Sequence, residues 1–200
     1  MAAERAALTS ADEAVFKRDL VGLIPHLRAF ARTLTGDATQ ADDLAQDAMI
    51  KAWDARKSFQ LGTNMKAWTF MILRNQFYSE KRRSWRQSQL DQEAAERTLV
   101  AVDDPEAPVA LDELRMALNT LPEEQREALI LVGAGGFAYE EAAEICQCAV
   151  GTVKSRVSRA RRALQATLDR GGYARDGRAA GDAMRSILAD ADRLSGVRQG

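Results

Sequence analysis

Residues 135–164 read GGFAYEEAAEICQCAVGTVKSRVSRARRAL, and their spacing predicts two amphipathic helices joined by a tight turn. We expect the first helix over 139–145, the turn over 146–151 and the second helix over 152–169. The apolar positions of the second helix, expected to face inward, are Val153, Val157, Ala160 and Leu164. Its outward positions are small or basic: Lys154, Ser155, Ser158, Arg159 and Arg162. This pattern is typical of a helix-turn-helix unit, whose second helix enters the major groove of DNA.

The lengths of the outward side chains are suited to contacts with DNA. Lys154 and Arg159 are long enough to meet guanine O6 and N7, whereas Ser155 and Ser158 let the backbone approach the groove. The outer arginines and the helix N-terminus are suited to binding the phosphate groups of the DNA backbone. Many amphipathic helix pairs are simple packing units, so the basic outward face is what favours DNA binding here.

Charge is segregated along the chain, although the net charge of its 200 residues is only −1. Residues 74–86 and 151–170 are basic, and residues 88–113 between them are acidic with Arg97 as the only base. Two basic stretches around an acidic one indicate two polyanion-binding modules on a tether. Solvated helix faces are the alternative interpretation.

The pattern of apolar residues in the N-terminal part of the sequence predicts a compact helical domain over residues 11–86. Apolar residues from Phe16 to Leu34 follow a helical stripe, which Pro25 should kink or restart. The run TLTGDATQ, residues 33–40, is expected to be a loop, with Thr39 capping a second helix. A further loop over 59–64 should precede a long helix over about 65–85, whose end is basic.

The remaining chain divides into a linker, a second domain and a tail. Residues 87–110 are acidic, carry two prolines and predict a flexible linker. The second domain, 111–170, should include a helix over 111–119 and another that has Pro122 at its first position and ends at Gly133. The tail, 171–200, fits either an amphipathic helix or a frayed end. The fold class is therefore all-α, with two small helical domains.

Composition excludes several classes of protein. The chain has no apolar run long enough for a membrane span, and acids near the N-terminus argue against an export signal. Two Cys and one His provide neither a disulfide framework nor a tetrahedral zinc site. Cys146 and Cys148 are better interpreted as small turn or core residues. We expect no metal, no cofactor and no catalytic residues.

The sequence resembles a known family in both halves. Residues 135–164, with LPEEQREALIL before them (121–131), resemble the fourth conserved region of extracytoplasmic-function (ECF) sigma factors of the sigma-70 type. ADDLAQDAMIKAW (41–53) and KAWTFMILRNQFYSEKRR (66–83) resemble the second region. The similarity spans about residues 12–168. IPHLRAFARTLTGD (24–37) and the 135–161 stretch most resemble the general-stress-response group of alphaproteobacteria, the EcfG or SigT type.

The resemblance implies a cytoplasmic transcription initiation factor, not an enzyme, that binds core RNA polymerase and promoter DNA. The second domain would read the −35 element through Thr152, Lys154, Ser155, Arg156, Ser158, Arg159 and Arg162. The first domain would capture the −10 strand through Trp68, Arg74, Asn75, Lys81, Arg82 and Arg83. The β′ clamp helices of the polymerase would dock on Asp43, Gln46, Asp47, Lys51 and Trp53, and the β flap is a further polymerase surface that the resemblance implies.

Some interpretations stay open at this point. Trp68 fits either a core position or a stacking platform, and the polar face around Asp47 fits either a docking face or a solvated helix. A stand-alone repressor with the same helix-turn-helix is one rival function, and a nuclease is a weaker one. The resemblance also implies control by a small anti-sigma factor of the NepR type. We expect it to cover residues near Leu44, Asp47 and Trp53, and apolar residues near Leu131, Val132 and Phe137.

Overall fold

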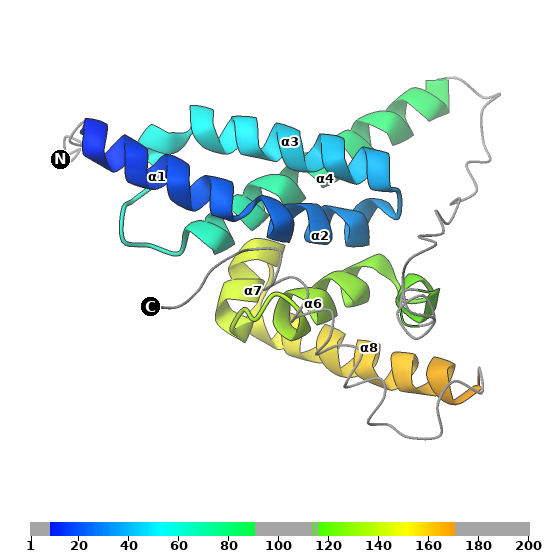
Figure 1. Cartoon of the computed structure of the whole chain (residues 1–200). Helices are drawn as coiled ribbons and strands as arrows, with labels where there is room; N and C mark the ends of the chain where they lie inside the picture. The colour runs from blue at the N-terminus through cyan, green and yellow to red at the C-terminus, as the bar shows by residue number, and fades with distance from the viewer. Residues whose placement is uncertain (1–8, 91–113, 115, 171–200) are drawn as a thin grey trace.

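The computed structural model describes residues 9–90, 114 and 116–170, and the regular elements in these ranges are all helical, which confirms the predicted class (Figure 1). The first group of helices comprises α1 (Ser10–Gly22), α2 (Ile24–Thr35), α3 (Ala38–Asp54), the 3₁₀ turn η1 (Arg56–Ser58) and α4 (Met65–Leu90). The second comprises α6 (Glu123–Gly133), α7 (Tyr139–Cys146) and α8 (Val150–Arg170). Within the described ranges, each helix is too short or too polar to cross a membrane.

The apolar stripe from Phe16 to Leu34 is divided into two helices at the position that the sequence predicted. Leu23 caps the end of α1, where its N–H donates to the Leu20 carbonyl at 3.1 Å. Pro25 then lies in the first turn of α2. Its missing N–H is tolerated there, because the first N–H groups of a helix have no intrahelical acceptor. The predicted fresh helix start at Pro25 is confirmed.

The loop expected over 33–40 is much shorter in the structure. Helix α2 continues to Thr35 and ends at Gly36, which has a φ of 72° and adopts the left-handed conformation that glycine tolerates best. Asp37 caps α3 by accepting the Gln40 N–H at 2.8 Å. The prediction of Thr39 as the cap was wrong, because Asp37 already supplies an acceptor two residues earlier.

The second group follows the predicted helix-turn-helix pattern with small shifts. Pro122 is the N-cap of α6 rather than its first helical residue, and α6 ends at Gly133 as expected. The turn after α7 is made by Gln147, a non-glycine residue with a φ of 52°. Helix α8 begins at Val150, two residues before the predicted start. Leu114 and residues 116–119 are helical, and the rest of the predicted 111–119 helix lies outside the described residues.

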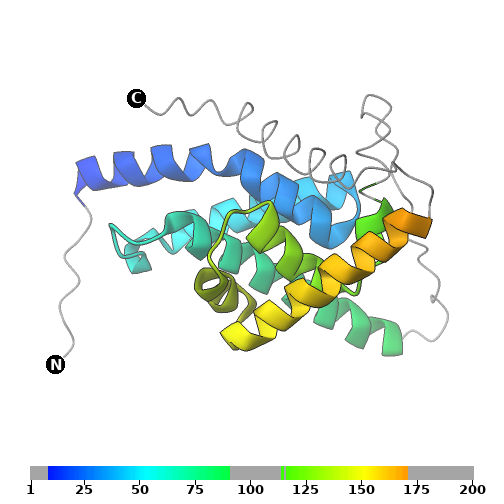
Figure 2. The ribbon, with the colours of Figure 1, turned by 90° about the horizontal axis from the view of Figure 1, so that it is seen from below.

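The two helical groups pack against each other, which the sequence did not predict. Helix α7 contacts α4, and α6 contacts α2, so that a single buried cluster extends from Leu27 and Phe70 to Phe137 and Val153. Helix α8 packs on α6 and α7 on the side away from the first group (Figure 2). The acidic linker and the tail lie outside the described residues, apart from 87–90, which continue α4.

Candidate nucleic-acid interface

Helix α8 presents the outward face that its sequence predicts. Val153, Val157 and Ala160 are buried against α6 and α7. The predicted contact residues on the opposite face are exposed: Lys154, Ser155, Ser158, Arg159 and Arg162. Since these residues lie on the side of α8 that faces away from the first group, the packing of the two groups leaves this surface open.

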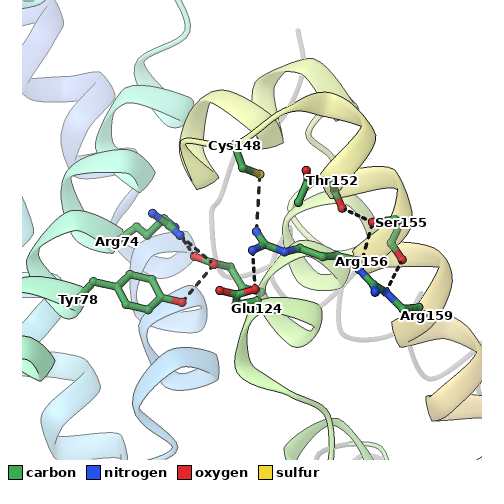
Figure 3. A network of polar contacts seen from close by, with 9 residues as sticks. Arg74, Tyr78, Glu124, Cys148, Thr152, Ser155, Arg156 and Arg159 are labelled. Carbon is green, nitrogen blue, oxygen red and sulfur yellow. Dashed lines mark hydrogen bonds and ion pairs between the residues drawn. The ribbon is translucent and has the colours of Figure 1, made fainter.

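Two of the basic side chains on this face contact neighbouring groups: Arg159 within α8, and Lys154 on α7. Arg159 folds back onto Ser155, with its Nε 3.3 Å from the Ser155 carbonyl and a terminal nitrogen 3.2 Å from Oγ (Figure 3). The Ser155 hydroxyl in turn donates to the Thr152 carbonyl at 2.9 Å. Lys154 places its Nζ 5.7 Å from the ring centre of Tyr139. These contacts are on the surface, so they compete only weakly with an added DNA ligand.

Arg156 does not lie on the outward face. Its side chain is 14% exposed and donates to the Glu124 carboxylate and, at 3.6 Å, to Cys148 Sγ. These contacts tie α8 to the start of α6 and to the turn after α7 (Figure 3). Thr152 is likewise only half-exposed. The structure thus separates these two residues from the other predicted contacts, because their positions on the helix turn them toward α6 and α7.

The residues of α4 predicted to contact the −10 strand differ in their exposure and in their contacts. Asn75, Arg82 and Arg83 are exposed. Trp68 packs into the small apolar cluster of the first group, with its ring centre 5.0 Å from that of Phe59 and 6.1 Å from that of Phe16. The contacts of Trp68 therefore match a core position more closely than a stacking platform.

Arg74 and Lys81 face the second group of helices and are paired with acids of α6. Arg74 Nε donates to Glu127 Oε1 at 2.6 Å, and Lys81 contacts the Glu123 carboxylate. Tyr78 donates its hydroxyl to Glu127 Oε2 at 3.3 Å and lies under the Arg74 guanidinium (Figure 3). Burial tends to lower the pKa of Arg74, but the Glu127 carboxylate outweighs it and the pKa is raised. Burial also raises the pKa of Tyr78.

Two residues of the predicted polymerase-docking face on α3 make contacts within the protein. Asp43, Gln46, Asp47 and Lys51 are exposed. Asp47 accepts the side-chain amide of Gln76 at 2.9 Å, and Trp53 lies half-buried under the guanidinium of Arg56, 4.6 Å from its ring centre. The exposed members make this a polar surface that carries both signs of charge.

Sequence reasoning missed the residues that join the two groups. Lys66 Nζ donates to the Gly135 carbonyl at 2.9 Å, and the Asn64 amide donates to Glu141 Oε1 at 2.6 Å. Glu127 is the clearest case, because its carboxylate is fully buried. The only signal in the sequence for the burial of Glu127 was its position directly before the apolar run of residues 128–132. Partners so distant along the chain could not be matched from spacing alone.

The arrangement contains no candidate metal centre. Among the described residues, His, Cys, Asp and Glu side chains nowhere gather in a group of three that could hold a metal ion. Cys146 is buried and Cys148 half-buried, both as free thiols. The site is therefore a set of basic and polar side chains suited to binding polyanions.

Comparisons with known proteins match both halves of the chain. The family description "Sigma-70 region 2" matches residues 22–87, and "Sigma-70, region 4" matches residues 111–164. The chain is 49% identical over 150 residues to the ECF RNA polymerase sigma factor EcfG of Rhodopseudomonas palustris, covering 75% of this chain and 83% of the relative. It is 34% identical to the RNA polymerase sigma-H factor of Pseudomonas aeruginosa, covering 66% and 75%.

A solved structure is similar in fold. It is the sigma factor RpoE of Bartonella quintana in complex with the anti-sigma factor NepR. The similarity has a TM-score of 0.70 and 46% sequence identity, and it covers 78% of this chain and 97% of the other. CnrH, solved in complex with the cytosolic domain of CnrY, is similar with a TM-score of 0.54 and 25% identity, covering 80% and 90%.

Proposed function

Because the chain belongs to the ECF class of sigma-70-type RNA polymerase sigma factors, we propose that it directs core polymerase to promoters through α8 and α4. A sigma factor is a transcription initiation factor and not an enzyme. The single observation that carries the residue-level proposal is the exposed basic face of α8, which the packing of the two helical groups leaves open.

We assign the −35 element to the outward face of α8. Lys154 and Arg159 are the base-reading residues, since both are exposed and long enough to reach guanine in the major groove. Ser155 and Ser158 lie between them and allow close approach, and Arg162 holds a phosphate. Arg156 and Thr152 support the helix instead, given the contacts of Arg156 to Glu124 and Cys148.

We assign the −10 strand to α4. Asn75 is an exposed amide that suits the edge of an extruded base, and Arg74, Lys81, Arg82 and Arg83 are the cations that suit its phosphates. Trp68 contributes indirectly, by fixing the start of α4 against Phe16 and Phe59.

We assign core-polymerase docking to α3, with Asp43, Gln46, Asp47 and Lys51 as its exposed members. Asp47 also accepts a hydrogen bond from Gln76, and Trp53 is half-buried beside Arg56. By family likeness, the partner surface is the β′ clamp helices, and the second domain meets the β flap. A factor that acts with polymerase works in the cytoplasm, which is the location we propose.

We further propose a role in the general stress response under a NepR-type anti-sigma factor. The support is the similarity to EcfG and to the sigma factor solved with NepR. In this arrangement three of the residues expected to contact the anti-sigma factor, Leu44, Leu131 and Phe137, are buried. An anti-sigma factor must therefore either bind outside these residues or separate the helices that cover them.

Run-off transcription tests the proposed function. Core polymerase with this chain should initiate at promoters that core polymerase alone ignores, whereas the chain alone should bind promoter duplex weakly. Tight dimeric binding to duplex without polymerase would instead indicate a repressor. Titration of the purified anti-sigma factor should release the chain from core, and a stable ternary complex with core would refute control by occlusion.

A further inference from the structure

Helix α4 carries one acidic side chain in its otherwise basic stretch, and this acid lies beside α3. Glu80 is the only acid in residues 74–86, which contain five bases. Its Oε1 accepts from the side-chain amide of Gln76 at 2.9 Å, and the same amide nitrogen donates to Asp47 Oδ2 at 2.9 Å. Since α3 and α4 pack against each other, one donor group holds carboxylates from two neighbouring helices close together (Figure 1).

The orientation of the Gln76 amide follows from its two partners. A carboxylate only accepts hydrogen bonds, so the NH2 group must face Asp47 and Glu80, with one hydrogen for each. The carbonyl end then points away from both acids, and Gln76 Oε1 is a buried acceptor without a donor among the described residues. Gln76 is only 4% exposed, and a buried acceptor without a donor costs free energy. The amide is therefore better explained by the position it gives to the two acids than by a gain in stability.

The two carboxylates are open to solvent and are not neutralised within the described residues. Asp47 and Glu80 are both exposed. Among the ion pairs of the part of the chain that the structure describes, none includes either carboxylate. Two like charges that share one neutral donor repel each other, and a cation between them would offset this repulsion. A guanidinium or ammonium group fits this place, because its N–H groups can donate to both carboxylates at once.

The position of the acid pair indicates the source of this cation. Asp47 belongs to the face of α3 that we assign to core-polymerase docking, and Asp43 and Gln46 are exposed on the same helix. DNA does not fit beside the pair, since two carboxylates repel its phosphates. A basic side chain of the polymerase is the occupant that matches both the charge of the pair and its continuity with the docking face.

We propose that Glu80 of α4 extends the polymerase-docking face of α3, and that Gln76 is the positioning residue that holds Glu80 beside Asp47 to accept one basic side chain of core polymerase. The inference rests on the proposed function, which places docking on α3. It adds an acid of the helix that we assign to the −10 strand, so that α4 contributes to polymerase docking as well as to strand capture.

Three single variants of the full chain test the roles of the acid and of the amide. Glu80→Gln removes the charge at an exposed position and keeps the size of the side chain. Gln76→Met removes both the donor and the unpartnered oxygen and replaces them with an unbranched side chain of similar volume. Asp19→Asn is the matched control, because Asp19 is an exposed acid on α1 that pairs with Arg18.

Fluorescence anisotropy of the labelled chain, titrated with purified core polymerase, measures docking at low and high salt. Glu80→Gln should bind core about tenfold more weakly at low salt, which corresponds to one lost charge-assisted contact. The difference should shrink at high salt, because salt screens exposed charges. Gln76→Met should lose a similar factor, while urea unfolding shows no loss of stability. Asp19→Asn should bind as the wild type does.

The double variant distinguishes positioning from a separate contact. If Gln76 acts through the acid pair, Gln76→Met should cost less affinity in the Glu80→Gln background than in the wild type. Two factors that simply multiply would show that the residues act independently and would overturn the positioning role. A fall in the stability of Gln76→Met that accompanies the loss of affinity, or a failure of this variant to fold, would also overturn that role.

The docking role of Glu80 stands on its own measurement. It is overturned if Glu80→Gln binds core as tightly as the wild type, or if Asp19→Asn loses as much affinity, since the loss would then be a general effect of charge. A wild-type chain that does not bind core at all would remove the proposed function as well. Failure of the inference alone leaves wild-type binding intact, so the two failures are distinguishable.

Discussion

Arg156 of α8 donates to the carboxylate of Glu124 in the first turn of α6, and this contact ties the two helices together beside their buried apolar packing. A basic residue inside the stretch that we assign to the −35 element thus makes a contact within the protein instead. The Arg156 side chain is 14% exposed and that of Glu124 is 63% exposed, so solvent screens the pair only on one side. Cys148 Sγ accepts a second, weaker contact from the same guanidinium.

Arg156→Ala should therefore lower stability and weaken DNA binding without changing which sequence is read. We expect a loss of about 1 kcal/mol in the free energy of unfolding, since the pair is partly solvated and the Arg stem also loses packing. Urea unfolding and holoenzyme binding to consensus and mutated −35 templates measure the two effects. Arg161→Ala, on the exposed side of α8, is the matched control and should leave stability unchanged.

Lys154→Ala and Arg159→Ala should reduce selectivity for the −35 element. Each is expected to cost about 1–3 kcal/mol on the consensus template if it makes a good base contact, and little on a mutated −35 template. Arg162→Ala should weaken both templates alike, because a phosphate contact carries no sequence information. Equal losses for all three variants on both templates would contradict the assignment of base readers.

Asn75→Ala should impair capture of the −10 strand more than binding to the −35 element. Its exposed amide on α4 is the group placed to read an extruded base. Open-complex formation on duplex and on pre-melted promoter DNA distinguishes reading from opening. A pre-melted template should restore little of the loss, and full rescue would assign Asn75 to the opening step instead.

Gly135→Ala should destabilise the packing of the second group of helices on the first. A Cβ at Gly135 would lie 2.6 Å from the Leu131 carbonyl and 2.8 Å from Cδ2 of Phe137, so the ring that packs on Phe70 must move. We expect a loss of about 1–3 kcal/mol, as for other overpacked sites, measured by urea unfolding. Gly133→Ala is the control. Its Cβ would meet nothing within 4 Å, and a change below about 1 kcal/mol in the stabilising direction is expected.

Cys146 should resist alkylation in the folded chain. Burial, and then the nearby Glu127 carboxylate, raise the pKa of the Cys146 thiol to about 12 from its ordinary 9.0, so the thiolate is scarce. The folded state keeps the proton more tightly than the unfolded state. The thiol's contribution to stability is therefore complete below 9.0 and is lost as the pH rises toward 12.

Iodoacetamide labelling followed by mass spectrometry measures this difference at about pH 8. Cys148, which is only half-buried, should react first, and Cys146 should react after urea is added. Rapid labelling of Cys146 in the native chain would show that the α7 end of the core opens readily.

Local features of the sequence predicted most of the helices. Pro25 marked a helix start, and Gly133 marked a helix end, because each acts through its own backbone. The cap of α3 was placed wrongly at Thr39, since Asp37, which stands two residues earlier, offers an equally good acceptor. Propensity alone does not choose between neighbouring caps.

The candidate site was predicted less completely, because its environment depends on distant residues. Lys154 and Arg159 could be assigned to the outward face from helical spacing alone. Arg74 could not be assigned in this way, since its partner Glu127 lies 53 positions away. Phe70 and Phe137 are farther apart still along the chain, so their contact, and with it the packing of the two groups, required the structure.

Helix α4 is a single element of 26 residues, which corresponds to a rod about 39 Å long. Its first half, with Phe70 and Leu73, is buried among other helices, whereas residues 80–87 are exposed and project beyond the bundle (Figure 1). Such a rod acts as a lever arm. A tilt of about 10° at its buried half shifts Arg86 by about 3–4 Å, so movements too small to disrupt the core reposition the arginines at its tip.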